Sequence, residues 1–374
     1  MSKSSVSAFV VKVTARCNLN CTYCYVYNMA DSTWRDQPKF MSEDTLETLV
    51  ARIKEHATGQ ALKRLILVLH GGEPLLLGPE KLDRYLSVIR TALGTLGIEV
   101  QIGMQSNGLL LTREIGAILT KHCATVGVSI DGIPGKGDWL RVDHKGVPSG
   151  AKLERVLKNF LATPYRDRFT GFIAVADITQ DARETFRYLA SFDPPSIDFR
   201  LPLNHHSNTP RRNAGQGSHT DYGRWYEEIF EELILSKRNL SVRLLSAIVQ
   251  GLTGQPRADL YWGNEETGIA VIESDGSYEL VDNLKSIGNA LTKTGLNLKD
   301  HSLDEFVSFR NDWIKREGLD QIPTQCSQCK LFSACRGCYY MSRFSKEDRF
   351  TKPSVYCTDM MHLIPKIHSR LAAA

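Results

Sequence analysis

The chain of 374 residues is long enough for one large domain or two ordinary ones, and its 42% hydrophobic and 24% charged residues favour a substantial core over disorder. The formal net charge of +4 comes without any Lys/Arg tract, which argues against a nucleic-acid binder. No segment approaches the roughly 18 apolar residues of a membrane span, and the N-terminus has no signal-peptide cleavage signature. We therefore expect a cytoplasmic protein, in which the nine cysteines are reduced.

Six short apolar runs, suited to buried parallel strands, alternate with helical patterns over the first 205 residues. The runs cover residues 8–14, 64–70, 98–106, 125–130, 171–177 and 197–203. Ser42 is a plausible N-cap for the first helix, and further helical patterns cover 79–93 and 151–162. The alternation predicts an α/β architecture, either an open doubly wound sheet or part of a barrel, with its ligand site at the C-terminal ends of the strands.

The alternation ends near residue 210. A helical segment near 219–236 leads into a mixed region and then into a cysteine-rich tail. We therefore expect three parts, which cover residues 1–205, 206–320 and 321–374.

Three cysteines, Cys17, Cys21 and Cys24, follow the first predicted strand in the stretch CNLNCTYC. A [4Fe–4S] cluster takes one thiolate on each iron, so three thiolates leave the fourth iron open to another molecule. Zinc also binds three thiolates, but a structural zinc site usually has a fourth Cys or His ligand, and the loop contains no His. The isolated Cys123 is expected to be a small buried residue near a strand start.

The spacing of these cysteines, with Tyr23 between the last two, resembles the signature of the radical S-adenosylmethionine superfamily. The resemblance covers residues 8 to about 205 and implies a partial (β/α)6 TIM-like barrel. It also implies that the methionine group of S-adenosylmethionine chelates the open iron. One electron from the cluster then releases a 5′-deoxyadenosyl radical, which abstracts a hydrogen atom.

The ends of the next three predicted strands carry further motifs of this superfamily: HGGEP, QSNG and SIDG with a following Arg. Each motif alone is also compatible with an ordinary loop. The resemblance implies that Gly71, Gly72 and Glu73 contact the amino group of S-adenosylmethionine. It implies that Ser106 and Asn107 contact the ribose, and that Ser129 and Arg141 contact the carboxylate.

The cysteine-rich tail resembles the SPASM extension of peptide-modifying radical enzymes, although a zinc ribbon is an alternative. The resemblance implies that one auxiliary [4Fe–4S] cluster is held by Cys326, Cys329, Cys335 and Cys357. The full family pattern includes a second auxiliary cluster, but here Val281 stands where a cysteine ligand is expected. We therefore expect two clusters in total, with Cys338 either spare or packed beside the auxiliary site.

Asp282 directly follows Val281 and matches the catalytic base of the related sulfatase-maturing enzymes. A general base must lie within hydrogen-bonding reach of its proton. The alternative is a surface or capping residue of a hairpin, because DGSY is a turn signal. We expect Asp275 to be the turn residue.

Several longer phrases resemble the FxsB-type maturases, which form three-residue cyclophanes in ribosomally made peptides. The resemblance implies abstraction of a β-hydrogen and attack of the carbon radical on an aromatic ring, with the auxiliary cluster as electron acceptor. Formylglycine formation, a thioether bridge, peptide epimerisation and a non-enzymatic metal-binding scaffold are the alternatives.

The implied partners are a precursor peptide, with leader and core, and an external electron donor such as flavodoxin or ferredoxin. The first predicted strand begins at residue 8, which leaves no room before it for a leader-binding domain. We expect the leader to bind at an exposed sheet edge or at residues 206–320, or to be presented by a separate protein.

Overall fold

The computed structural model describes residues 6–213, 219–255 and 268–373. The chain divides into two compact units, each built from segments that are distant in the sequence. The first unit comprises Met1–Ser129, Asp138–Thr170 and Thr267–Asp312, and the second comprises Ile130–Gly137, Gly171–Glu266 and Trp313–Ala374. The division into three consecutive parts stays a prediction.

The first unit contains seven neighbouring strands in the order β10-β9-β8-β1-β2-β3-β4. Their bounds are β1 (Ala8–Thr14), β2 (Arg64–Gly71), β3 (Glu99–Ser106), β4 (Ala124–Ser129), β8 (Ile269–Ile272), β9 (Ser277–Glu279) and β10 (Lys293–Asn297). Strands β8, β1, β2, β3 and β4 pair in parallel, whereas β9 is antiparallel to both β8 and β10. Residues after the C-terminal ends of β1 to β4 therefore come together at one edge of the sheet.

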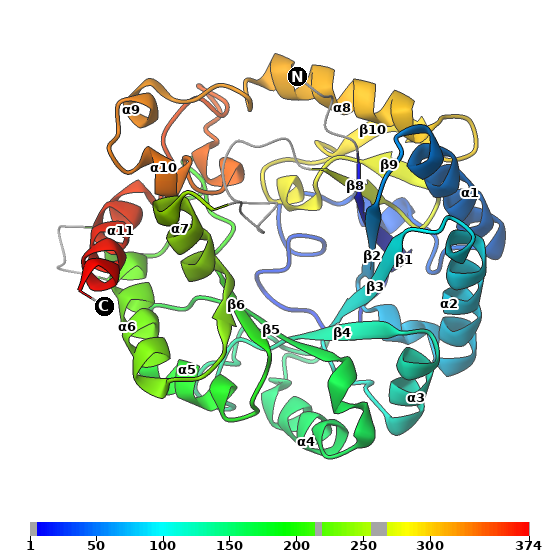
Figure 1. Ribbon diagram of the computed structural model, residues 1–374, viewed down its shortest axis with the longest axis horizontal. Coiled ribbons are helices and arrows are strands. Elements are labelled where there is room, and N and C mark those ends of the chain that lie inside the picture. Colours follow the sequence, from blue (N-terminus) through cyan, green and yellow to red (C-terminus); the bar gives the residue numbers. More distant parts are fainter. Residues whose placement is uncertain (1–5, 214–218, 256–267, 374) are drawn as a thin grey trace. The chain divides into compact units, whose positions relative to one another are not determined.

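The helices of the first unit connect these strands, and Figure 1 shows α1, α2 and α3 on the outer side of β1–β4. They are α1 (Glu43–Gly59), α2 (Pro79–Gly94), α3 (Arg113–Lys121), α4 (Gly150–Leu161) and most of α8 (Leu303–Glu317), with short 3₁₀ turns η1 (Thr33–Asp36), η2 (Pro74–Leu77), η3 (Pro164–Arg168) and η4 (Asp282–Ser286). The predicted N-cap is confirmed, because Ser42 Oγ accepts a hydrogen bond from Thr45 N at 3.1 Å.

The second unit contains most of β5 (Phe169–Val175), together with β6 (Ser196–Arg200) and β7 (Ser241–Val242), in that order and all parallel. Its helices are α5 (Ala182–Ala190), α6 (Asp221–Ser236), α7 (Arg243–Thr253), α9 (Thr324–Ser327), α10 (Phe332–Cys335) and α11 (Cys357–Ala372), with the 3₁₀ turn η5 (Tyr340–Arg343). Glu227 of α6 contacts His362 and Lys366 of α11 at 2.6 and 3.2 Å. The C-terminal helix is thereby fixed to the unit that carries the cysteine-rich tail.

The predicted α/β class is confirmed, since all six expected strands are present and helices alternate with them. The turn between β8 and β9 is also as predicted: Asp275 Oδ1 accepts from Ser277 N at 2.9 Å, and Gly276 has φ +85°. The expectation for Cys123 was wrong. Its side chain is exposed, because the residue has φ +49° in the tight connection between α3 and β4. Among the described residues, no helix is both long and apolar enough to cross a membrane.

Candidate functional site

The loop after β1 carries Cys17, Cys21 and Cys24, all half-buried. A second segment of the first unit fixes the shape of this loop: Asn20 N donates to Val142 O at 2.7 Å, and Thr22 N donates to Leu140 O at 2.9 Å. The imidazole of His144 also lies 3.0 Å from Cys17 O. The three-cysteine loop is therefore held by backbone contacts that leave its thiols available for ligands.

The thiols of this loop interact with one another. Burial raises the pKa of Cys17 to about 12, a hydrogen bond from Leu19 N opposes the rise, and negative charge on Glu73, Cys21 or Cys24 adds to it. Burial also raises the pKa of Cys24, and Arg141 opposes this rise. Because burial raises the pKa of Cys17 and Cys24, a metal that binds here must displace the protons of these two thiols.

The donor set fits a [4Fe–4S] cluster better than a single ion. In the cluster, each thiolate binds a different iron, so the sulfur atoms surround the cubane without meeting at one point. Tetrahedral zinc needs ligands that converge on a single centre. In the parts of the chain that the structure describes, no group of three or more His, Cys, Asp and Glu side chains converges in this way.

Glu73 follows β2 and is fully buried. Its Oε1 accepts hydrogen bonds from Leu75 N at 3.0 Å and Ser106 Oγ at 2.8 Å, and its Oε2 accepts from Asn107 N at 2.7 Å. Burial raises the pKa of Glu73, and these three donors oppose the rise. The carboxylate is thus oriented by the end of β3, and its remaining acceptor positions suit an ammonium group.

Asn107 joins the end of β3 to the three-cysteine loop. Its Nδ2 donates to Asn18 Oδ1 at 2.7 Å and lies 3.8 Å from Cys17 Sγ. Ser106 donates its hydroxyl to Glu73, and its predicted contact with a ribose stays a prediction. These contacts place two predicted cofactor-binding residues next to the cluster loop.

The two glycines before Glu73 allow a close approach of two backbone segments. A Cβ on Gly71, which has φ +127°, would collide with Thr14 O, and a Cβ on Gly72 would collide with Arg16 O and Tyr27 Oη. The approach that the structure describes is to the end of β1, where the cysteine loop begins, and the predicted approach to a ligand stays a prediction. Side chains at these positions would push the loop away from Glu73.

The predicted carboxylate clamp has two separate sets of contacts. Arg141 Nη1 donates to Tyr23 Oη at 2.8 Å, which brings the guanidinium to the cysteine loop. Ser129, at the end of β4, accepts from Gln105 Nε2 at 2.9 Å. Both side chains lie in the first unit.

Asp282, the predicted base, is linked directly to the three-cysteine loop. Its Oδ2 accepts a hydrogen bond from the hydroxyl of Tyr25, the residue after Cys24, at 2.8 Å. The carboxylate is buried. The structure thus brings together Asp282 and the cysteine loop, which are more than 250 positions apart in the sequence.

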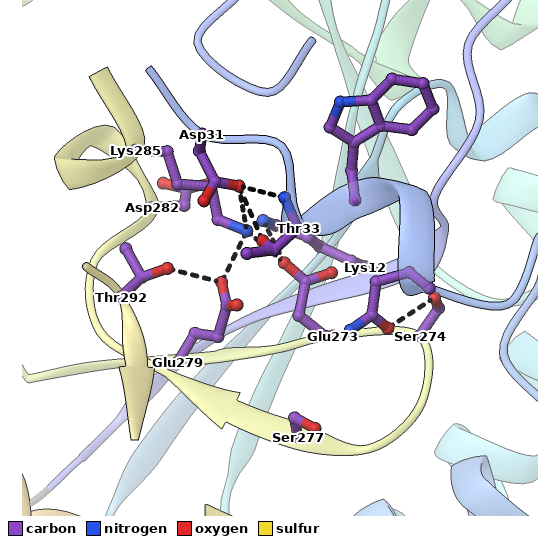
Figure 2. A network of polar contacts seen from close by, with 12 residues as sticks. Lys12, Asp31, Thr33, Glu273, Ser274, Ser277, Glu279, Asp282, Lys285 and Thr292 are labelled. Atoms are coloured by element: carbon purple, nitrogen blue, oxygen red, sulfur yellow. Dashed lines mark hydrogen bonds and ion pairs between the residues drawn. The ribbon is translucent and has the colours of Figure 1, made fainter. Parts of the chain in front are cut away.

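Next to Asp282 lies a buried charge network, defined by Lys12, Asp31, Glu273, Glu279 and Lys285 (Figure 2). Sequence analysis missed this network. One signal was present, because a lysine within the apolar run AFVVKVT must find a partner once the strand is buried.

In the second unit, the four cysteines assigned to the auxiliary cluster interact with one another. Burial raises the pKa of Cys326, and charge on Cys357 or Cys329 adds to the rise while Arg343 opposes it. Burial likewise raises the pKa of Cys335, and charge on Cys338, Cys357 or Cys326 adds to this rise. Thiols that interact in this way, with the buried Arg343 beside Cys326, are compatible with the ligands of a [4Fe–4S] cluster.

Cys338 lies beside Cys335, since its N–H donates to Cys335 O at 2.9 Å, but its thiol also has contacts of its own. Its buried thiol interacts with the hydroxyls of Ser342 and Ser354 and with the N–H of Tyr339, all of which lower its pKa, while burial raises it to about 12. The backbone of Cys338 is left-handed, with φ +61°. These contacts favour a packing role for Cys338.

Comparisons with known proteins agree with the geometry. Residues 11–189 match the family model described as the Radical SAM superfamily. The cysteine-type anaerobic sulfatase-maturating enzyme of Clostridium perfringens is 24% identical over 357 residues, which cover 94% of this chain and 93% of that enzyme. The serine-type enzyme of Bacteroides thetaiotaomicron is 24% identical over 371 residues, with coverage of 90% and 83%.

Among solved structures, anSMEcpe with bound AdoMet and Cp18Cys peptide superimposes with a TM-score of 0.81 at 22% identity, and the match covers 98% of each chain. This likeness shows that the two chains share a fold. The family match covers the strands that carry the cysteine loop, Glu73 and Asn107. Residues 11–189 are therefore similar to the Radical SAM superfamily.

Proposed function

We propose that this chain is a radical S-adenosylmethionine enzyme that oxidises a residue within a peptide. The observation that carries the proposal is the 2.8 Å hydrogen bond between Tyr25 and Asp282, because it connects the cysteine loop with a buried carboxylate. A radical enzyme that oxidises a peptide must remove a proton near the place where the radical forms.

In this proposal Cys17, Cys21 and Cys24 hold the first [4Fe–4S] cluster, and Cys326, Cys329, Cys335 and Cys357 hold the auxiliary cluster. When bound, the first cluster and S-adenosylmethionine supply a 5′-deoxyadenosyl radical, and the auxiliary cluster supplies a one-electron acceptor. Glu73 accepts the ammonium group of S-adenosylmethionine, and Arg141 pairs with its carboxylate. Asn107, Ser106 and Ser129 orient the remainder of the cofactor.

Asp282 removes the proton. Abstraction of a hydrogen atom from a β-carbon leaves a carbon radical, and the oxidised product forms when that radical loses one electron and one proton. The buried carboxylate of Asp282 accepts this proton, and the hydroxyl of Tyr25 fixes its Oδ2. A positioned general base typically contributes about 10²- to 10⁴-fold to such a step.

Formylglycine formation on a Cys or Ser residue is the first candidate for the product, because sulfatase-maturating enzymes match this chain over nearly its whole length. The carbon–carbon crosslink of a three-residue cyclophane is the second candidate. It is favoured by the segment between β9 and η4, where Val281 stands in place of the cysteine that the three-cluster pattern requires. Both products need the same β-hydrogen abstraction and the same base. Flavodoxin or ferredoxin would supply the reducing electron.

The test uses anaerobically reconstituted protein with two synthetic peptides. One carries a sulfatase-type Cys motif, and the other has an aromatic residue two positions from an aliphatic one. We expect 5′-deoxyadenosine to form with at least one peptide. An aldehyde that can be trapped by a hydrazine identifies formylglycine. New aromatic-proton signals in the NMR spectrum of the peptide identify the crosslink. Protein that cleaves S-adenosylmethionine but modifies neither peptide would contradict the proposal.

Two variants separate the roles. Replacing the three cysteines of the first loop by Ala should abolish 5′-deoxyadenosine. Asp282→Asn should keep 5′-deoxyadenosine but lower the modified peptide by about 10²-fold or more. Asp275→Asn is the matched control, since this aspartate lies in the nearby turn between β8 and β9, where it accepts from Ser277 N and Gln37 Nε2.

A further inference from the structure

Cys357 stands apart from the other three cysteines assigned to the auxiliary cluster. Cys326 and Cys335 lie within the short helices α9 and α10, and Cys329 lies between these helices, whereas Cys357 is the first residue of α11. A [4Fe–4S] cluster needs its four thiolates at fixed relative positions. The start of α11 must therefore be held in place by contacts of its own.

Arg212 supplies such contacts on both sides of Cys357. Its Nη1 donates to Asp359 Oδ1 at 3.0 Å and lies 2.8 Å from Asp359 Oδ2, and its Nη2 donates to Val355 O at 3.0 Å. Val355 comes two residues before Cys357, and Asp359 comes two residues after it. A single guanidinium thus joins the two segments that flank the cysteine, which its planar set of donors makes possible.

Aromatic rings fix the orientation of this guanidinium. It lies 5.4 Å from the ring centre of Tyr222 and 5.9 Å from that of Tyr356, and the two rings pack edge to face at 5.2 Å. The hydroxyl of Tyr356 donates to Pro202 O at 2.8 Å. The residue directly before Cys357 is thereby tied to the segment that follows β6.

The start of α6 holds the residues after Cys357. Gly223 N donates to Asp359 Oδ1 at 2.9 Å, and a Cβ on Gly223 would collide with Asp359 O. The hydroxyl of Thr358 donates to His219 O at 2.7 Å. Helices α6 and α11 lie side by side in the second unit (Figure 1). The contacts that fix the first turn of α11 therefore come from residues 202–223, outside the cysteine-rich tail.

Two buried carboxyl groups face Arg212. Asp359 is fully buried, and Asp221, which is 5% exposed, has its Oδ2 3.8 Å from Arg212 Nη1. Within the described parts of the chain, neither side-chain oxygen of Asp221 has a hydrogen-bond donor. Without the arginine, two carboxylates would face each other in the interior with no cation between them. The position of α11 therefore depends on this one side chain.

We propose that Arg212 is a positioning residue for the auxiliary cluster, which holds Cys357 where the fourth iron binds. The inference rests on the proposed function, which assigns Cys357 as a ligand. Residues that orient metal ligands without touching the metal typically contribute about 10- to 100-fold to metal affinity or activity. The auxiliary site is thus completed by the region before the tail.

The first experiment isolates the auxiliary cluster. Every protein carries Ala in place of the three cysteines of the first loop, so that iron content and spectra report the auxiliary cluster alone. This parent protein is compared with Arg212→Gln, with Arg212→Lys and with Cys357→Ala, which is the reference for a lost ligand. Arg187→Gln is the matched control, because Arg187 also contacts a carboxylate of α6, that of Glu232, through two N–H groups.

We expect about four iron atoms per chain in the parent and about three in Arg212→Gln, because a cluster held by three thiolates loses its fourth iron readily. An oxidised three-iron cluster gives an electron paramagnetic resonance signal that the oxidised four-iron cluster lacks. Arg212→Gln should show this signal, as Cys357→Ala does. Arg212→Lys, which keeps a cation beside Asp359, should show less of it, and Arg187→Gln should show none.

Two results would overturn the inference. One is an Arg212→Gln protein with the full iron content and no new signal. The other is loss of the whole cluster from Arg212→Gln, because that would mean that the arginine supports the fold of the unit and not the position of one ligand. If Arg212→Gln does not fold, Arg212→Lys decides by the same signal.

The second experiment uses the protein with all nine cysteines and both synthetic peptides. Arg212→Gln should produce 5′-deoxyadenosine as Arg187→Gln does, whereas modified peptide should fall by about 10- to 100-fold. An unchanged ratio of the two products would contradict the inference. The reference variant separates the two proposals. A Cys357→Ala protein with the full iron content and no new signal would remove Cys357 from the proposed cluster. A changed Cys357→Ala with an unchanged Arg212→Gln would keep the cluster and remove the role of Arg212.

Discussion

The buried carboxyl group of Glu279 predicts a specific pH dependence of stability. Glu279 is 1% exposed, and its Oε2 accepts from Lys285 Nζ at 2.8 Å and from Thr292 Oγ1 at 3.1 Å. Burial raises the pKa of Glu279 from its ordinary 4.5 to about 7; Lys12 and Lys285 oppose this rise, and the charge of Glu273 adds to it. The folded protein therefore holds this proton more tightly than the unfolded chain does.

The sign follows from that difference. A carboxyl group whose pKa is raised by folding contributes stability that is complete below about pH 4.5 and is lost as the pH rises through about 7. Each pKa unit corresponds to about 1.4 kcal/mol, so the rise from 4.5 to about 7 sets an upper limit of about 3 kcal/mol. Glu273 and Glu279 share the charges of the two lysines, so the measured change should lie below this limit.

Glu279→Gln isolates the effect, because its amide is neutral at every pH and its carbonyl oxygen still accepts from Lys285 and Thr292. The free energy of unfolding is measured by urea denaturation of both proteins between about pH 5 and pH 8. The wild type should lose about 1 to 3 kcal/mol of stability relative to Glu279→Gln as the pH rises. Glu99→Gln, on an exposed strand residue of the same unit, should show no such trend. A pH-independent difference between wild type and Glu279→Gln would refute the reasoning.

Three further predictions concern the clusters and the cofactor. Reconstituted protein should contain about eight iron atoms per chain, measured by a colorimetric iron assay, because it has ligands for two [4Fe–4S] clusters; about twelve would contradict the argument from Val281. Replacing Cys326 and Cys329 by Ala should remove about four of these iron atoms. Cleavage of S-adenosylmethionine should stay intact, whereas modified peptide should be lost. Modified peptide made at the normal rate by a folded variant would exclude the auxiliary cluster from the reaction. Glu73→Gln should weaken S-adenosylmethionine binding, measured by calorimetry. It should also destabilise the protein by about 1 to 3 kcal/mol, because an amide group would then face donors from Leu75, Ser106 and Asn107. Unchanged binding would argue against Glu73 as the acceptor of the ammonium group.

The strands and most helices could be predicted from the sequence because their patterns are local. Buried parallel strands are short continuous apolar runs, and amphipathic helices repeat their apolar residues at helical spacing. The run 64–70 became β2 (Arg64–Gly71), and the periodic segment after Ser42 became α1 (Glu43–Gly59). Both elements are determined by residues within a few turns or a few pleats of each other.

The surroundings of Asp282 could not be predicted in the same way, because they depend on strand pairing across the chain. The hydrogen bond with Tyr25 joins residues 257 positions apart, and the ion pair of Lys12 with Glu273 joins residues 261 positions apart. Neither distance follows from a local pattern. Cys123 shows a smaller limit of the same kind, since its exposure depends on a left-handed backbone in one tight connection.

The charge network also bears on how the position of Asp282 is fixed. A buried ion pair adds little net stability, but loss of one partner typically costs about 3 to 5 kcal/mol, because an uncompensated charge stays buried. The lysines of β1 and η4 therefore restrict the hairpin to arrangements that keep Glu273 and Glu279 paired. Asp282 lies three residues after the end of β9 and is the first residue of η4. The position of the hairpin therefore also determines where the carboxylate of Asp282 lies relative to Tyr25. Charges on three separate segments thereby fix one side chain of the proposed active site.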